Sequence, residues 1–167
     1  MAKTQALPHI TRNDMPAATR ARMAALLNAR LADAIDLHLQ AKQAHWNVKG
    51  PQFISLHELF DKVAEAAEDG ADLLAERLVA LGGRAEGTVQ TVASRTSLRA
   101  YKATLSNGAD HVTAVSDAIA SVGRGVREAM DTADRAGDTG TADLFTELSR
   151  DLDKLLWFVE AHAQAAR

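Results

Sequence analysis

Hydrophobic residues recur every three or four positions along four long stretches of this chain, which is the spacing that gathers them on one side of an α-helix. The stretches cover residues 15–48, 52–82, 107–136 and 141 to about 164. Asp14 and Pro16 suit the start of the first stretch, and Gly82 with Gly83 suits the end of the second. Alanine and leucine abound, whereas the aromatic residues are only four Phe, two Trp and one Tyr, so the sequence predicts an all-α fold.

A polar segment rich in Thr, Ser and Arg, residues 84–106, joins the second and third stretches. It is too long for the turn between two antiparallel neighbours, so it should cross the length of the molecule, and we expect a short helix in it near residues 98–101. Four long helices with one such crossover predict a ferritin-like four-helix bundle. The bundle should occupy residues 15–167, after a flexible, weakly basic tail over residues 1–14.

The second helical stretch carries one histidine and five acids along one side. In chain order these are His57, Asp61, Glu65, Glu68, Asp72 and Glu76, spaced by four, four, three, four and four residues. A solvated polar face would have the same pattern. However, this line contains no lysine or arginine, and each pair of acids four residues apart destabilises a helix by about 0.2–0.5 kcal/mol. An uncompensated row of acids therefore favours a bound cation.

A single copy of this helix cannot form one metal site from both ends of the acidic line, because the two ends lie too far apart. Asp61 and Asp72 should lie about 16 Å apart along the helix axis, whereas bonds from a metal to its ligands are about 2 Å long. A second copy lying antiparallel across a two-fold axis would set Asp61 of one chain against Asp72 of the other, and His57 against Glu76. The symmetry then predicts two equal sites in each pair of subunits.

His45 lies in the last turn of the first stretch, where the negative end of the helix dipole favours a cation; a hydrogen-bonded core histidine is the alternative. His57 lies at the positive end of the second helix, which keeps its ring neutral and able to bind a metal. Because the chain has no cysteine, imidazole and carboxylate are its strong ligands, which favours iron, zinc or manganese. The sequence has no Glu-x-x-His pair, phosphate-binding loop or nucleophile elbow, so an intrachain di-iron centre, phosphoryl transfer and acyl transfer are not expected.

Four segments carry distinctive combinations of residues: KQAHWNVKG, FISLHELFD, DLLAERLVALGG and RDLDKLLWFVE. Together they resemble the Dps mini-ferritins, the DNA-binding proteins of starved bacterial cells, and the resemblance covers nearly the whole chain. It implies a ferroxidase site, with iron as the metal, whose five ligands are His45, His57, Asp61, Asp72 and Glu76. The first three would come from one subunit and the last two from its two-fold mate.

The resemblance also implies a homo-oligomeric, hollow shell of twelve subunits. Such a shell oxidises Fe(II), preferably with hydrogen peroxide, stores the ferric mineral and thereby protects DNA from oxidative damage. Trp46 resembles the family's tryptophan beside the centre, which intercepts stray oxidising equivalents, although core packing is the alternative. Asp138 and Asp143 resemble the carboxylates of a three-fold entry pore, but Asp143 is equally a first-turn acid favoured by the helix dipole.

Charge is distributed unevenly between the start of the chain and the rest. The net charge is −3, and residues 1–22 carry Lys3, Arg12, Arg20 and Arg22 against Asp14, which leaves −6 for the remainder. Relatives that compact DNA have longer, lysine-rich tails, so we expect DNA binding to be weak here and to disappear as salt rises. The alternative function is a nucleoid-compacting DNA-binding protein whose ferroxidase activity is incidental, and the third is a bundle without metal.

The sequence also predicts a location. No apolar run approaches the roughly 20 residues of a membrane-spanning helix. The opening residues, MAKTQALPHI, lack the apolar core of a secretion signal. We therefore expect a cytoplasmic protein without a membrane partner, associated with the nucleoid wherever it binds DNA.

Overall fold

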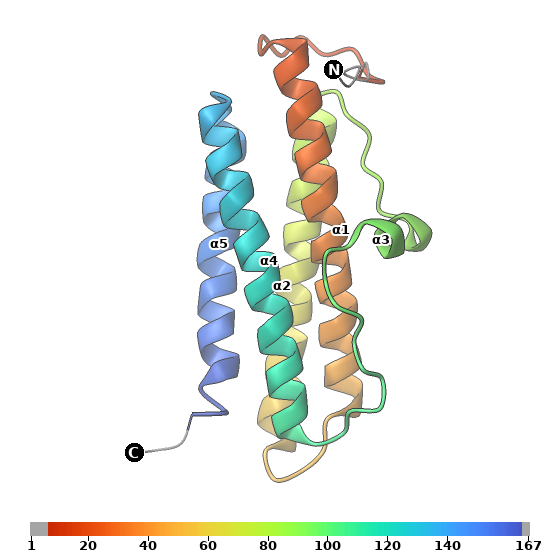
Figure 1. Cartoon of the computed structure of the whole chain (residues 1–167), viewed down its shortest axis with the longest axis vertical. Coiled ribbons are helices and arrows are strands. Elements are labelled where there is room, and N and C mark those ends of the chain that lie inside the picture. The colour runs from red at the N-terminus through yellow and green to blue at the C-terminus, as the bar shows by residue number, and fades with distance from the viewer. Residues whose placement is uncertain (1–6, 165–167) are drawn as a thin grey trace.

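The computed structural model describes residues 7–164, and this part of the chain is helical apart from one isolated bridge between Lys49 and Asn107. Four long helices form an antiparallel bundle (Figure 1): α1 (Ala17–Asn47), α2 (Phe53–Ala80), α4 (Gly108–Arg135) and α5 (Thr139–Glu160). The predicted all-α bundle is confirmed. Three of the long helices lie inside the stretches that the hydrophobic pattern predicts, and α5 begins two residues earlier than expected. No helix in the described residues is long and apolar enough to cross a membrane.

The helices pack as two hairpins, α1 with α2 and α4 with α5, which enclose a core of leucine, valine and alanine side chains (Figure 1). The crossover leaves the end of α2, runs beside α1 along the length of the bundle and enters α4, so that α2 and α4 point the same way (Figure 1). Among the side chains with almost no exposed surface are Phe60, Phe145, Met23, Leu27 and Leu74. This core leaves one side of α1 and α2 uncovered in the single chain.

The short helix of the crossover is α3 (Val89–Arg95), so its expected position near residues 98–101 is wrong. The segment around Leu98 is instead held against α1 by side chains that bind its backbone. Buried Asp33 accepts hydrogen bonds from the Ser97 backbone N–H at 2.7 Å and from its hydroxyl at 2.9 Å. Gln40 donates to the Arg99 carbonyl at 3.0 Å. Because these backbone groups are hydrogen-bonded to side chains of α1, they are not available for the hydrogen bonds of a helical turn.

The end of the crossover is held by a contact between half-buried Tyr101 and buried His111, whose Oη and Nδ1 atoms lie 2.6 Å apart. Burial raises the pKa of the Tyr101 hydroxyl to about 12. Burial also lowers the pKa of the His111 imidazole. Both groups are therefore neutral near pH 7, as a pair without a compensating charge requires.

The expected tail, residues 1–14, lies partly outside the described residues, since the structure describes the chain from Leu7 onward. From there the chain lies against the end of α2. Leu7 packs on the core, and the His9 backbone N–H donates to the Gly82 carbonyl at 3.2 Å. Arg20 donates to the Leu81 carbonyl at 3.1 Å, so this cation serves an internal contact. The boundary between tail and bundle stays a prediction.

Gly125, inside α4, makes room for a partly buried arginine of α1. A Cβ atom at this position would collide with the Arg30 guanidinium, whose Nη2 pairs with the buried Asp33 carboxylate at 2.9 Å. At Gly123 the nearest atom to such a Cβ would be the exposed Arg127 Nη1, at an ordinary 3.4 Å. Packing therefore explains Gly125, and nothing in the structure explains Gly123.

The two glycines should respond in opposite ways to alanine. We expect Gly123→Ala to stabilise the protein by about 0.5–1 kcal/mol, because alanine favours the helix and no neighbour has to move. Gly125→Ala should destabilise it by about 1–3 kcal/mol, because the added methyl group displaces Arg30 from Asp33. Urea unfolding at one fixed protein concentration measures both. Equal shifts for the two variants would contradict the packing role of Gly125.

Candidate metal centre

The two histidines at the junction of α1 and α2 hold each other in place. His45 Nδ1 lies 2.7 Å from the His57 carbonyl oxygen, and His57 Nδ1 lies 2.8 Å from the His45 carbonyl oxygen. The rings stack with centroids 3.7 Å apart and planes 20° from parallel. A carbonyl only accepts, so each Nδ1 carries the proton and each Nε2 of the neutral ring presents a lone pair. Histidines that bind metals are commonly oriented in this way.

Asp61 adds an ionised carboxylate to this pair. Its Oδ1 lies 3.9 Å from His45 Nδ1, one helical turn beyond His57. The Asp61 pKa is lowered chiefly by a hydrogen bond from Lys42, whose Nζ lies 2.6 Å from Oδ1, and further by the positive charge of that ammonium. Partial burial acts in the opposite direction. Asp61 is therefore ionised at neutral pH and available to a cation.

Sequence reasoning missed Lys42 as a member of this site. The residue lies one turn before His45 on the same helix, so its spacing offered a signal, but its contact with Asp61 joins two different helices. Its ammonium also lies 5.9 Å from the Trp46 ring centroid. A cation that binds Asp61 must compete with this ammonium.

Asp72 and Glu76, the other two expected ligands, lie farther along α2 with exposed side chains. The single chain therefore brings His45, His57 and Asp61 together and leaves Asp72 and Glu76 apart from them. Over residues 7–164 no three histidine or acid side chains are grouped so that they could hold a metal ion. Completion of a site by a second subunit stays a prediction.

Exposed apolar side chains border the half-site formed by His45, His57 and Asp61. Trp46 is 65% exposed, so it is not a core residue of its own subunit. Phe53 and Ile54, at the start of α2, are also exposed, and the Phe53 ring centroid lies 5.2 Å from that of His57. Leu39, on α1, extends the same kind of surface. Exposed apolar residues around a polar half-site are typical of a subunit interface.

The structure places the two expected pore acids differently. Asp138 is 1% exposed and caps α5 by accepting the Thr141 backbone N–H at 3.0 Å. Arg77 of α2 also donates to it, with Nη2 at 2.7 Å. A carboxylate committed to a cap and an ion pair cannot line a pore, so the expected role of Asp138 is corrected to a structural one. Asp143 is exposed, and its pore role stays a prediction.

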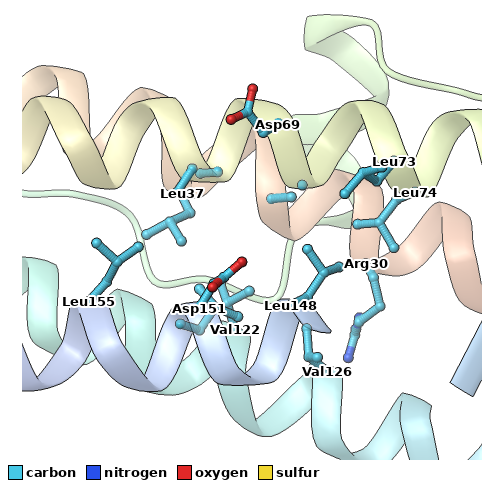
Figure 2. A pocket seen from close by; sticks show the side chains of 15 residues that line it. Arg30, Leu37, Asp69, Leu73, Leu74, Val122, Val126, Leu148, Asp151 and Leu155 are labelled. Carbon is cyan, nitrogen blue, oxygen red and sulfur yellow. The ribbon is translucent and has the colours of Figure 1, made fainter. Parts of the chain in front are cut away.

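A cavity of about 110 Å³ lies between the helices, away from the histidines. Side chains from all four long helices line it, including Leu37, Leu74, Val122 and Leu148 (Figure 2). Pockets for small molecules are usually about 300–1,000 Å³ and contain several converging polar groups. This apolar gap is therefore a packing defect rather than a substrate site.

The chain is similar to proteins of one family in both sequence and fold. Residues 24–167 match the family model described as a ferritin-like domain. The DNA protection during starvation protein of Agrobacterium fabrum is 48% identical over 156 residues, which cover 93% of this chain and 96% of that protein. DpsA14 from Streptomyces coelicolor superposes with a TM-score of 0.90 at 35% identity, covering 96% of this chain and 95% of its own. Dps from Microbacterium arborescens, solved in a high iron form, gives 0.84 at 35% identity, covering 92% and 98%.

Proposed function

Because this chain belongs to the Dps family of ferritin-like proteins, we propose that it oxidises ferrous iron at sites between subunits and stores the ferric product in a hollow shell. The observation that carries the proposal is the mutually bonded pair of histidines. His45 and His57 each donate Nδ1–H to a carbonyl and keep a free Nε2, beside an Asp61 held ionised. Imidazole and carboxylate together suit Fe(II), which is the substrate here.

The remaining ligands would come from a second subunit. Asp72 and Glu76 face solvent on α2, too far along the helix to turn back to His57. An antiparallel, two-fold apposition of α2 with its copy supplies the partner's Asp72 and the partner's Glu76 to each half-site. The exposed Trp46 and Phe53 would be covered by the same contact, which would remove their apolar surface from water.

The proposed reaction balances with hydrogen peroxide as oxidant. Each of two Fe(II) ions loses one electron, the O–O bond of one peroxide accepts both, and two protons complete two water molecules. Oxidising the ions as a pair avoids the one-electron step that releases hydroxyl radical. Within this site Asp61 would exchange the Lys42 ammonium for iron, and the histidines would contribute their Nε2 lone pairs. Trp46, beside the site, would intercept stray oxidising equivalents.

We further propose twelve subunits per shell, a cytoplasmic location, and entry of iron past Asp143. DNA would be protected chiefly by removal of iron and peroxide. Nucleoid compaction is the weaker alternative, because the start of the chain has little free positive charge. Of its four cationic residues, Arg20 binds the Leu81 and Met15 carbonyls. Any binding should therefore disappear steeply with salt.

Iron loading and DNA binding can be measured on one preparation. The mass of the apoprotein assembly is measured by native mass spectrometry. The protein is then loaded with Fe(II) in the absence of oxygen and treated with peroxide, and its mass is measured again. We expect about two Fe(II) oxidised per peroxide, because the ions react as a pair. The iron should remain with the assembly, and a gel-shift assay at about 150 mM salt should leave DNA free. Persistent DNA complexes without retained iron would instead favour the compaction function.

A further inference from the structure

We propose that a hollow between the crossover and α4 binds a small phosphate monoester that carries hydroxyl groups, such as a sugar phosphate or a nucleoside monophosphate. This crossover hollow is lined by residues 97–102 and 105 of the crossover, by one side of α4 between residues 114 and 124, and by Gln40 of α1. In Figure 1 this part of the crossover follows α3 and runs along the bundle to the start of α4. The hollow contains none of the expected ferroxidase ligands, so the inference does not depend on the proposed function.

The crossover hollow has the size and the mixed lining of a small-molecule site. Its volume is about 560 Å³, within the roughly 300–1,000 Å³ that is usual for such sites and well above the 110 Å³ of the apolar gap between the helices. Leu98 and Ala118 contribute apolar surface. On α4, Asp117, Ser121 and Arg124 follow one another by four and three residues, so the helical period places them on the same side. Polar and apolar groups therefore meet in one space that is large enough for a ligand.

Gln40 gives the hollow a deeply buried polar group with a fixed orientation. The residue is only 6% exposed, and its Nε2 donates to Asp36 Oδ1 at 3.1 Å and to the Arg99 carbonyl at 3.0 Å. These two bonds use both hydrogens of the amide and identify the remaining atom, Oε1, as an acceptor. No hydrogen bond within the described residues engages Oε1. A ligand in the hollow that carries an O–H or N–H group would satisfy it.

The wall of the hollow that the crossover forms is held in place from behind. Ser97 donates its backbone N–H and its hydroxyl to buried Asp33, at 2.7 Å and 2.9 Å. The Tyr101 Oη lies 2.6 Å from Nδ1 of His111, which is completely buried. These contacts keep the hollow open in the absence of a ligand, so binding does not have to order this segment first.

Three cations line the crossover hollow without an acid to pair with. Arg99 and Lys102 come from the crossover and Arg124 from α4, and all three side chains are exposed. No salt bridge in the described part of the chain includes any of them, whereas exposed Arg127, one turn beyond Arg124 on α4, pairs with Asp153. Unpaired positive charges around one hollow repel one another and attract an anion.

The charges and hydrogen-bonding groups of the lining indicate which anion fits. The three cations against one acid, Asp117, leave a net charge of +2. A phosphate monoester carries about −1.5 to −2 charges at pH 7, and guanidinium groups bind its oxygens two at a time. Asp117 and Gln40 Oε1 accept hydrogen bonds but cannot donate them, so the rest of the ligand must supply O–H or N–H donors. Sugar hydroxyls meet this requirement, whereas the phosphates of duplex DNA have no 2′-hydroxyl beside them.

Calorimetric titration of the assembled protein tests this site. The protein is freed of metal, because bound iron would itself bind phosphate. Ribose 5-phosphate and adenosine monophosphate are the probes, and at about 50 mM salt, where exposed charges are only partly screened, both should bind while ribose and adenosine do not. Inorganic phosphate should bind at least about tenfold more weakly than ribose 5-phosphate, because it brings no sugar hydroxyls to Asp117 and Gln40. The tighter of the two probes distinguishes a sugar-phosphate site from a nucleotide site.

Substitutions in the lining should separate the contribution of each group. Arg124→Gln and Lys102→Gln should each weaken ribose 5-phosphate binding at least about tenfold, because each removes a charged donor to the phosphate. Arg150→Gln is the matched control, since Arg150 is an exposed cation of α5 that lies outside the hollow and in no salt bridge of the described residues. Asp117→Asn should leave inorganic phosphate bound at least as tightly and reduce the preference for ribose 5-phosphate over it, because the charged acceptor for the hydroxyls is lost.

Three results would overturn the proposal. The first is the absence of binding heat from both probes at about 10 mM. The second is equal weakening by Arg124→Gln and Arg150→Gln, which would assign the attraction to the charge of the whole surface. The third is displacement of ribose 5-phosphate by a short DNA duplex whose own binding is weakened by Arg124→Gln and Lys102→Gln, which would make this face a nucleic-acid contact. Native mass spectrometry should give the same assembly for every variant.

Discussion

The double variant His45→Ala/His57→Ala should lose peroxide-driven iron oxidation by at least about a hundredfold, since even removal of an indirect ligand contact costs about 10–100-fold. Each substitution deletes a proposed Nε2 ligand whose ring is held by the other histidine's carbonyl. The apolar faces of α1 and α2 are unchanged, so the protein should still fold. Its free energy of unfolding should fall by about 1 kcal/mol for each lost hydrogen bond. Stopped-flow absorbance after anaerobic loading with Fe(II) measures the rate.

A histidine outside the site provides the control for this experiment. His9 is exposed and contributes only its backbone N–H to a contact, so His9→Ala should oxidise iron at the unmodified rate. Native mass spectrometry should give the same assembly for all three proteins. If the double variant oxidised iron as fast as His9→Ala, the paired histidines would not be the ferroxidase ligands, and the proposed function would lose its main support.

Activity should return when two inactive variants are assembled together, provided that each site is shared between subunits. One variant lacks the histidines, and the other carries Asp72→Asn with Glu76→Gln. In a mixed two-fold pair one site receives both defective halves and the other receives two intact halves. Random mixing at equal amounts should therefore restore about a quarter of the unmodified rate, because half of the pairs are mixed and each has one working site.

The mixing experiment includes its own controls. Each variant unfolded and reassembled alone should stay inactive, and the unmodified protein treated in the same way should recover its full rate. Native mass spectrometry reports whether mixed assemblies have formed. Mixed assemblies that remain inactive would show that the histidines and the Asp72 and Glu76 pair do not complete a site across the two-fold axis.

Much of the candidate metal centre could be proposed from the sequence, because it depends on spacing within single helices. The interval between Asp61 and Asp72 follows from the rise per residue, and it already excludes a site closed by one chain. The shared face of His57 and Asp61 follows from the helical period. The family resemblance then assigned His45 to the same site, and the structure places its ring against that of His57.

Other parts of the site could not be predicted, because they depend on contacts between residues far apart in the chain. Lys42 and Asp61 are neighbours only because α1 packs against α2. Asp138 resembled a pore carboxylate, but the approach of Arg77 from α2 makes it a buried ion-pair partner. Trp46, an apolar residue next to a ligand, could equally have been core, and its exposure became clear only when the bundle was assembled.

The sequence by itself determined the four long helices, their order and the length of the crossover, since a repeat of three or four residues is a local property that burial turns directly into helices. Only the tertiary structure decided where the crossover forms α3, why Gly125 must lack a side chain, and which nitrogen of His45 and His57 carries the proton. Each of these depends on the hydrogen-bond partner or the space that a neighbouring helix provides. That neighbour is set by the packing of the whole bundle rather than by nearby residues.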